Sequence, residues 1–338
     1  MKESMPYIVG NSELRRRLCD DILKNTEAHA YILAGPHGSG RHTLALNFAA
    51  ALACENRDKS SEPLPCLHCP SCRKILEGKS PDVIVIGKTG QSVKIEQIRN
   101  LKNDVVTLPN DLDDKIYILE DADTMTTAAQ NAFLLTLEEP PSYVHFFLLC
   151  TKPEKLLETV RSRAPILRTE LLPDRLVREY LDSNNKTAAM LSRTKPQEFE
   201  EILTIAAGSI GRALELCDDK ERAPLLKQRT TAADFVGAAL ERNFVTLVEW
   251  ILALPQKQDE LLPILGCVQN ALRDLIVLKS SEDSPLVFYT DRESAAQLAY
   301  ASSTAALFRL SDTVTKTVDG ISRNANIRLS LVTMISDI

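Results

Sequence analysis

Four short, unbroken apolar runs within the first 150 residues are the feature that most limits how this chain can fold. The runs are residues 31–34, 83–86, 116–119 and 145–149. Each is bounded by glycine, proline or charged residues, as is typical of strands buried on both faces of a parallel sheet. The helical patterns between them are 41–53, 93–106 and 125–138. This alternation predicts an α/β domain with right-handed crossovers.

The pattern changes near residue 170, where the apolar runs stop. Amphipathic helical patterns follow at 174–182, 198–207, 244–254, 258–279 and 303–318. A chain of 338 residues is long enough for two or three domains. We therefore expect an α/β domain over 1–169, a small helical domain over 170–220 and an all-α domain over 221–338.

Composition and charge exclude some classes of protein. The hydrophobic and charged fractions, 44% and 25%, are those of an ordinary globular protein. A net charge of -6 argues against a chain that coats DNA by bulk charge, although it permits a local basic groove. The first residues have no apolar run of signal-peptide length, and runs such as 145–150 are too short to span a bilayer. We expect a cytoplasmic protein.

A glycine-rich loop, GPHGSG, joins the first apolar run to the following helix. Gly35 and Gly40 have the spacing of the phosphate-binding P-loop, and Gly38 lies between them. In a working P-loop, a lysine and a magnesium-binding hydroxyl come next, but here Arg41 and His42 do. Arginine keeps the charge without the compact ammonium group. The sequence predicts a degenerate P-loop, and a simple strand-to-helix turn is the alternative.

Acidic residues end the third apolar run, with Glu120, Asp121 and Asp123 close together. In an ATPase, carboxylates at this place hold magnesium and activate water. The usual order is Asp then Glu, and its reversal here displaces each carboxylate by one methylene group. Whether the acids are a remnant of such a site or a solvated strand end, they are misplaced for magnesium.

Four cysteines follow the first predicted helix with the spacing C-x11-C-x2-C-x2-C: Cys54, Cys66, Cys69 and Cys72. Four thiolates form a closed tetrahedral shell around zinc, so the spacing predicts a structural Zn²⁺ site with no position for water. We place the neighbouring His68 outside this shell. Four incidental buried cysteines are the alternative. The other cysteines are isolated and suit core packing.

Three further segments accompany these motifs: LLTLEEPP at 134–141, FFLLCTKPEKLLETVRSRA at 146–164 and GSIGRAL at 208–214. With them the chain closely resembles, over about residues 7–215, the delta prime family of bacterial DNA polymerase III clamp-loader subunits, which are of the AAA+ class. The resemblance implies a P-loop domain, a helical lid and an all-α collar. It also implies gamma/tau ATPase subunits and a delta subunit as partners, and action on a sliding clamp and primed DNA.

The resemblance assigns roles to three residues. Arg163 matches the arginine of the family's Ser-Arg-Cys motif, which reaches the ATP of a neighbouring gamma or tau subunit, although the motif's cysteine is Ala164 here. Thr151 and Arg212 match positions that sense nucleotide. Beside a degenerate P-loop we expect these two to serve packing or hydrogen bonding. The resemblance therefore implies a stator that does not bind or does not hydrolyse ATP and that donates Arg163 as an arginine finger.

Other functions remain open. Arg163 as a surface salt-bridge partner is one alternative to its role in trans. The chain as a weakly active AAA+ ATPase is another, with Arg41 and backbone N–H groups binding nucleotide and Glu120 holding magnesium. A DNA-binding zinc finger over 54–80 is disfavoured, because its charge is nearly balanced and it lacks aromatic residues for base stacking.

Overall fold

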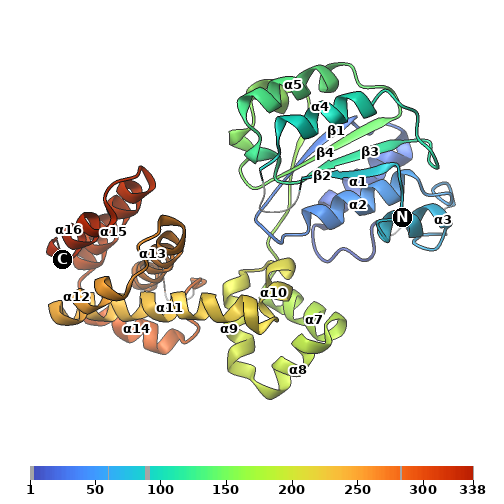
Figure 1. The fold of residues 1–338 in the computed structure, drawn as a ribbon. Helices are drawn as coiled ribbons and strands as arrows, with labels where there is room; N and C mark the ends of the chain where they lie inside the picture. The colour runs from blue at the N-terminus through green and yellow to red at the C-terminus, as the bar shows by residue number, and fades with distance from the viewer. Residues whose placement is uncertain (1–3, 60, 88–91, 282–283, 338) are drawn as a thin grey trace. The chain divides into compact units, whose positions relative to one another are not determined.

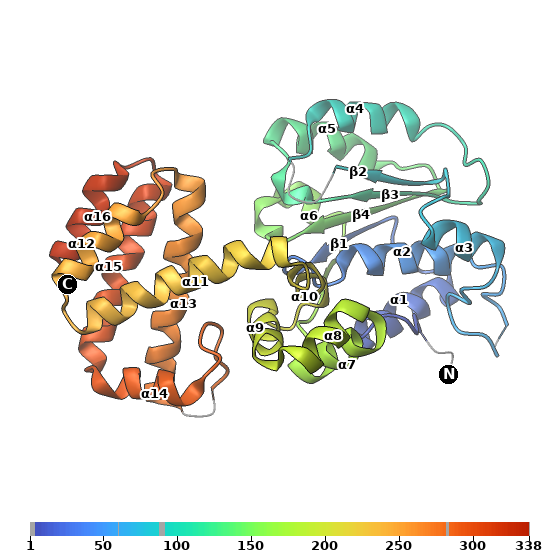
Figure 2. The same cartoon turned by 60° about the horizontal axis from the view of Figure 1, so that its bottom comes forward.

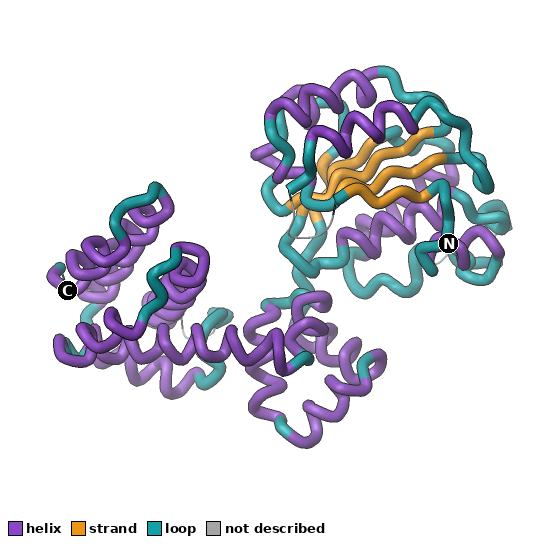
Figure 3. Tube along the Cα trace, viewed as in Figure 1, coloured by secondary structure: helices purple, strands orange, loops and turns teal. Residues whose placement is uncertain are grey.

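The computed structural model describes residues 4–59, 61–87, 92–281 and 284–337. The chain divides into two compact units. The first comprises Met1–Leu176 and Ser209–Arg212, and the second comprises Val177–Gly208 and Ala213–Ile338. Strands occur only in the first unit among the described residues (Figure 3).

A five-stranded parallel sheet forms the centre of the first unit, with the strand order β2-β3-β4-β1-β5. The strands are β1 (Ala30–Ala34), β2 (Val83–Ile86), β3 (Lys115–Leu119), β4 (Val144–Cys150) and β5 (Ile166–Arg168). The three central strands, β3, β4 and β1, are buried along their whole length. This burial explains why their sequences are unbroken apolar runs.

Helices cover both faces of this sheet (Figures 1 and 2). One face packs against α1 (Ser12–Lys24), α2 (Arg41–Leu52) and α3 (Pro70–Leu76). The other face packs against α4 (Ile95–Asp104), α5 (Thr127–Glu138) and the short α6 (Glu158–Arg161). Two one-turn 3₁₀ helices, η1 (Ala122–Thr124) and η2 (Pro153–Lys155), follow β3 and β4 at the carboxyl edge of the sheet. The unit is therefore a three-layer α/β domain.

A buried carboxylate fixes the loop that leads into β3. Asp82 accepts hydrogen bonds from the backbone N–H groups of Asn110 (2.7 Å), Asp111 (2.7 Å) and Leu112 (3.0 Å). Burial acts to raise the pKa of Asp82, but these hydrogen bonds to its ionised form outweigh burial, so the pKa lies below its usual value. Asp82 thus holds one end of β3, and the acidic residues follow the other end.

The predicted strands and helices of the first unit are confirmed to within a few residues. The strand β5 was missed because it has only three residues, two of them exposed, and so lacks an apolar run. Helices α1 and α3 were also missed. The α3 helix begins within the cysteine loop, where Cys69 is its N-cap and Pro70 its first residue.

Helices are the regular secondary structure of the second unit over its described residues. Its helices are α7 (Asp174–Asn184, whose first turn lies in the first unit), α8 (Lys186–Thr194), α9 (Pro196–Ala206), α10 (Ile210–Leu216, which begins in the first unit), α11 (Asp219–Leu240), α12 (Phe244–Ala253), α13 (Gln258–Ser280), α14 (Arg292–Ala301), α15 (Thr304–Ser322) and α16 (Ile327–Ser336). The core of this unit is built around α13, against which α11, α14 and α15 pack. The predicted boundary at 220/221 falls inside this unit, near the start of the continuous α11, and stays a prediction.

One helix, α13, is long and apolar enough by composition to cross a membrane, although the sequence showed no unbroken apolar run of that length. Half of its most apolar window is buried within the protein. Leu265, Val268 and Leu272 are among its fully buried side chains, and Asp274 is buried with them. The central helix of a helical core passes the same test of length and composition, and α13 occupies that place here.

The expected α/β fold with a parallel sheet, followed by helical segments, is therefore confirmed.

Candidate functional site

The glycine-rich loop lies between β1 and α2, at the carboxyl edge of the sheet. The Gly35 N–H donates to the Cys150 carbonyl at the end of β4 (3.0 Å), and Ser39 Oγ lies 2.7 Å from Thr169 Oγ1. Gly40 is the N-cap of α2 with φ +84°, a left-handed conformation that favours glycine. The sequence thus keeps the backbone path that a P-loop needs at the N-terminus of a helix.

The segment Ser209–Arg212 packs directly on this loop. The Gly211 N–H donates to the Gly38 carbonyl (3.0 Å), and Ser209 Oγ donates to the His37 carbonyl (3.1 Å). A Cβ atom on Gly211 would lie 2.7 Å from the Gly38 Cα, and one on Gly38 would lie 2.5 Å from the Arg212 nitrogen. Both glycines are therefore required by close contact between two backbones, independently of any phosphate.

The two altered P-loop residues contact the two reversed acids. Arg41 is only 6% exposed, and its Nη2 lies 3.8 Å from Asp121 Oδ1. His42 Nδ1 makes a short hydrogen bond to Glu120 Oε1. Each acid thus faces a cationic or hydrogen-bonding group of the loop. A magnesium ion would have to compete with both partners for these carboxylates.

One nitrogen of the buried Arg41 has no hydrogen-bond partner among the described residues, namely Nη1. Unpaired buried donors are rare, because leaving a charged N–H group without a partner costs free energy. Arg41 is also the first residue of α2, where the helix dipole favours anions. This nitrogen is therefore a buried side-chain donor that an anion at the loop could use.

Thr151 and Arg212, the two residues expected at nucleotide-sensing positions, form hydrogen bonds with nearby groups. Thr151 Oγ1 donates to Asp123 Oδ2 (2.9 Å), and the Lys152 N–H donates to the same oxygen (2.9 Å). The Arg212 N–H donates to Ser209 Oγ (3.2 Å) at the start of α10. Thr151 is thus bonded through its side chain and Arg212 through its backbone, and the structural role expected for the two residues stays a prediction.

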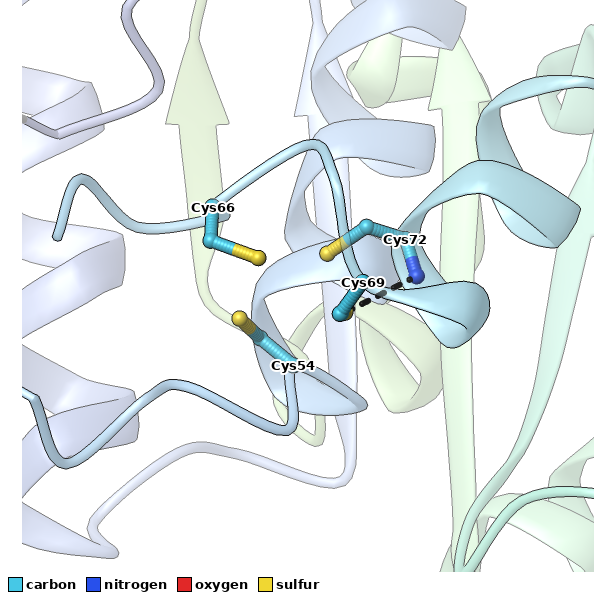
Figure 4. Close-up of side chains that lie close together, drawn as sticks. All are labelled: Cys54, Cys66, Cys69 and Cys72. Carbon is cyan, nitrogen blue, oxygen red and sulfur yellow. Dashed lines mark hydrogen bonds between the residues drawn. The ribbon is translucent and has the colours of Figure 1, made fainter.

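The four predicted zinc ligands meet in one cluster (Figure 4). The sulfur atoms of Cys54, Cys66, Cys69 and Cys72 lie within 4.8 Å of one another, and all four residues are at most 4% exposed. A tetrahedral zinc ion about 2.3 Å from each sulfur would hold the sulfurs about 3.8 Å apart. The buried all-thiol donor set therefore fits a structural metal ion after a small contraction.

Polar groups around the cluster match those of thiolate metal sites. Asn56 Nδ2 donates to Cys66 Sγ (3.4 Å), and the Cys72 N–H donates to Cys69 Sγ (3.4 Å). A hydrogen bond between Cys54 and Cys72 lowers the pKa of Cys54 and raises the pKa of Cys72, so this pair of thiols releases its first proton readily and holds the second. His68 instead points its Nδ1 at the Cys66 carbonyl (2.9 Å) and is not part of the cluster, as we expected.

The predicted finger, Arg163, lies just after α6 on the surface of the first unit. Its side chain is 35% exposed. Nη2 donates to Glu138 Oε1 (2.7 Å) at the end of α5, and Nη1 donates to the Thr159 carbonyl (2.8 Å). The guanidinium group of Arg163 is therefore held in one orientation at the surface by groups of α5 and α6.

Sequence reasoning missed Glu138 and Gly211, although both lie in segments that it singled out. Glu138 belongs to LLTLEEPP and Gly211 to GSIGRAL. Two adjacent acids at the end of a predicted helix were a usable signal, because the C-terminus of a helix favours cations and the acids need a cationic partner. Only the fold shows that this partner is Arg163.

Comparison with known proteins finds relatives of this chain among DNA polymerase III subunits. The model of the family described as "DNA polymerase III, delta subunit" matches residues 10–172. The delta' subunit of DNA polymerase III from Bacillus subtilis is 25% identical over 306 residues, which cover 89% of this chain and 86% of the relative. The delta' subunit from Pseudomonas aeruginosa is 31% identical over 184 residues, 54% of this chain and 53% of the relative.

The chain is therefore similar, over residues 10–172 and beyond, to delta prime-type subunits of DNA polymerase III. The tau subunit of DNA polymerase III from Bacillus subtilis is also similar, at 29% identity over 211 residues, 62% of this chain. The matched region spans only 36% of that tau subunit. A DNA polymerase III gamma subunit-related protein from Thermotoga maritima aligns over 95% of this chain and 97% of its own, with 17% identity and a TM-score of 0.44.

Proposed function

We propose that this chain is a subunit of a bacterial clamp loader that does not hydrolyse ATP itself, serves as a stator, and donates Arg163 in trans to the ATP of a neighbouring gamma or tau subunit. The contrast between its two arginines carries the proposal. Arg41 is buried against Asp121 within the chain's own loop, whereas Arg163 is presented at the surface. The catalytic contribution of the chain is then made outside its own P-loop.

The chemistry of the loop supports the absence of hydrolysis. A P-loop ATPase needs a hydroxyl on magnesium and a carboxylate that orients water. His42 replaces the hydroxyl residue and also hydrogen-bonds Glu120, while Arg41 faces Asp121. The same substitutions that remove the magnesium ligand therefore also engage the two carboxylates.

The chemistry of arginine supports the role in trans. Charge develops on the phosphoryl oxygens during transfer, and an arginine from a neighbouring subunit stabilises that charge. The guanidinium group is always protonated, so its positive charge is present throughout the reaction. Arg163 has the exposure that such a contact requires, and its backbone is anchored by α6. The residue after it, Ala164, is buried, so the replacement of the motif's cysteine changes core packing beneath the arginine.

We further propose that the thiol cluster binds Zn²⁺ and that this metal is structural. A closed shell of four thiolates leaves no position for substrate. The cluster joins the end of α2 to α3, since Cys54 follows α2 and Cys72 lies within α3. When bound, the ion would cross-link the cysteine loop. It would thereby stabilise a segment that is too short to form a hydrophobic core of its own.

The helical domain predicted over 221–338 is proposed to be the oligomerisation collar. Two packed helices of the second unit, α12 and α16, expose six large apolar side chains: Phe244, Val245, Val248, Leu252, Leu329 and Val332. Large apolar side chains that stay exposed on neighbouring helices are a common feature of protein interfaces. We propose the corresponding helices of gamma/tau and delta subunits as its partners, with the sliding clamp and primed DNA reached through the complex, in the cytoplasm.

The test of the function is the ATPase of the reconstituted complex with Arg163→Ala. We expect assembly with gamma/tau and delta subunits to be normal, and the DNA-stimulated ATPase to fall by about tenfold or more. Arg16→Ala, which removes an exposed arginine of α1, is the matched control. An unchanged ATPase with Arg163→Ala would eliminate the role in trans.

One observation favours a second function, a weakly active ATPase. The unpaired Nη1 of Arg41 offers a phosphate oxygen a donor at the N-terminus of α2. Titration of the purified chain with ATP and Mg²⁺, followed by an assay of phosphate release, distinguishes the two. The stator proposal predicts no release above background, and steady turnover by the chain alone would replace it with the second function.

A further inference from the structure

We propose that Glu138 is the positioning residue of the arginine finger, holding the Arg163 guanidinium in the orientation in which it meets a neighbour's nucleotide. The inference rests on the role in trans proposed for Arg163. It adds a second residue of this chain to that site, one that acts through Arg163 and does not touch the nucleotide.

The contacts of Arg163 leave donors for a phosphate. Each terminal nitrogen of a guanidinium group carries two N–H groups. One bond from Nη2 to Glu138 Oε1 (2.7 Å) and one from Nη1 to the Thr159 carbonyl (2.8 Å) fix the plane of the group. The second N–H of each nitrogen can then bind a phosphate oxygen while the first keeps its intramolecular partner.

The helix that carries Glu138 also holds the segment that carries Arg163. Gln130, eight residues earlier in α5, is buried and bonds to both sides of the joint between η2 and α6. Its Nε2 donates to the Lys155 carbonyl (3.3 Å), and its Oε1 accepts from the Leu157 N–H (2.7 Å). Gln130 thus anchors the backbone that leads to Arg163, and Glu138 anchors the side chain.

The place of Glu138 in α5 is unfavourable for the helix alone. Glu138 is the last residue of α5, Glu139 is its C-cap, and the last turn has no basic residue. Carboxylates at a helix C-terminus face the negative end of the helix dipole. The Arg163 guanidinium supplies the cation that this end of α5 lacks, so the pairing serves both groups.

Exposure argues that the pair does little for stability. Glu138 is 43% exposed in its side chain and Arg163 is 35% exposed, and ion pairs at such exposure contribute little to folding. A long arginine side chain nevertheless has many rotamers. Restricting it to one before the neighbour's nucleotide arrives lowers the cost of reaching the reactive geometry. The effect of Glu138 should therefore appear in the rate, with little change in the melting temperature.

The experiment compares Glu138→Gln, Arg163→Ala, the double variant and Glu139→Gln in the reconstituted complex with clamp and primed DNA. The readouts are kcat and KM for DNA-stimulated ATP hydrolysis, with complex yield and Tm as measures of folding. We expect Glu138→Gln to lower kcat about 3- to 30-fold with KM and Tm nearly unchanged, because the guanidinium loses its charged partner. Glu139→Gln, the matched control, should behave as wild type.

The double variant decides whether Glu138 acts through Arg163. We expect it to match Arg163→Ala alone, since a positioning residue has no effect without the group that it positions. If Glu138→Gln keeps wild-type kcat while Arg163→Ala lowers it, the inference is wrong and the proposed function stands. If the Glu138→Gln effect persists in full without Arg163, the inference is also wrong. If Arg163→Ala itself has wild-type kcat, both fail.

Discussion

Arg41 and Arg163 are two arginines of one domain with opposite environments. Arg41 is buried at the start of α2, lies 3.8 Å from Asp121, and keeps an unpaired nitrogen. Arg163 is partly exposed, and both of its terminal nitrogens are hydrogen-bonded. The same residue type thus takes two different environments within one domain. Burial directs Arg41 to an acid of its own chain, whereas exposure leaves Arg163 accessible to a neighbouring chain.

The largest expected effect is a difference in rate between variants of the two arginines. Arg163→Ala should lower the DNA-stimulated ATPase of the complex at least about tenfold more than Arg41→Met does, because in the proposed function only Arg163 meets the transferring phosphate. Methionine keeps much of the length of Arg41 and removes its charge. Steady-state hydrolysis by complexes of equal subunit content measures the difference. Equal losses from the two variants would break the comparison.

Metal removal should lower the stability of the first unit, and this effect should be independent of Arg41 and Arg163. Cys69→Ser or strong chelation should lower the Tm of the first unit by several degrees, because the cysteine loop loses its cross-link. Elemental analysis should give one zinc per wild-type chain and less in the variant. Cys217→Ser, outside the cluster, is the control for loss of a buried thiol. Wild-type protein that is purified without chelators and holds no metal would defeat the zinc assignment.

A smaller loss of stability is expected when the backbone contact between Gly38 and Gly211 is disturbed. Gly211→Ala places a Cβ 2.7 Å from the Gly38 Cα, so one of the two backbones must move. We expect about 1–3 kcal/mol of destabilisation by urea unfolding, as for other overpacked positions. Gly237→Ala, where an added Cβ meets nothing within 4 Å, is the matched control within a helix. If the loop were only a phosphate cradle, Gly211→Ala would leave stability unchanged.

The smallest expected effect is a loss of stability on substitution of Asp82. Backbone N–H groups hold this carboxylate, whereas side chains hold Glu120 and Asp121. Asp82→Asn should lower the free energy of unfolding by about 1–2 kcal/mol at neutral pH. The two carboxylate oxygens of Asp82 together accept three backbone N–H groups, and the substitution turns one of these oxygens into an amide donor. The pKa of Asp82 is lowered by folding, so its contribution is complete above its unfolded value near 4 and is lost as the pH falls through the folded value.

Urea unfolding between about pH 3 and 7 measures this dependence. Wild type should lose stability toward acid more steeply than Asp82→Asn does. Parallel curves for the two proteins would show that Asp82 does not contribute to the acid dependence.

Local patterns in the sequence predicted much of this molecule. The buried strands follow from their apolar runs, and the thiol cluster follows from a spacing that places two cysteines three residues apart on one turn. The contacts that form the candidate site join segments that are far apart in the sequence. Gly38 and Gly211, Arg41 and Asp121, and Glu138 and Arg163 meet only when the chain folds, and no periodicity encodes such pairs.

The short strand β5 shows a second limit. Its middle residue, Leu167, is buried while Ile166 and Arg168 are exposed, so the strand is formed by pairing with β1 and has little apolar signal of its own.

The contact between Gly38 and Gly211 has a consequence for how such chains change over generations. A glycine that is needed for the packing of two backbones is retained whether or not the loop handles phosphate. Selection against misfolding alone is then enough to preserve Gly38, while Gly35 and Gly40 set the P-loop spacing. The presence of Gly38 is therefore no criterion for an active ATPase, and the lysine and hydroxyl positions that follow Gly40 are the better one.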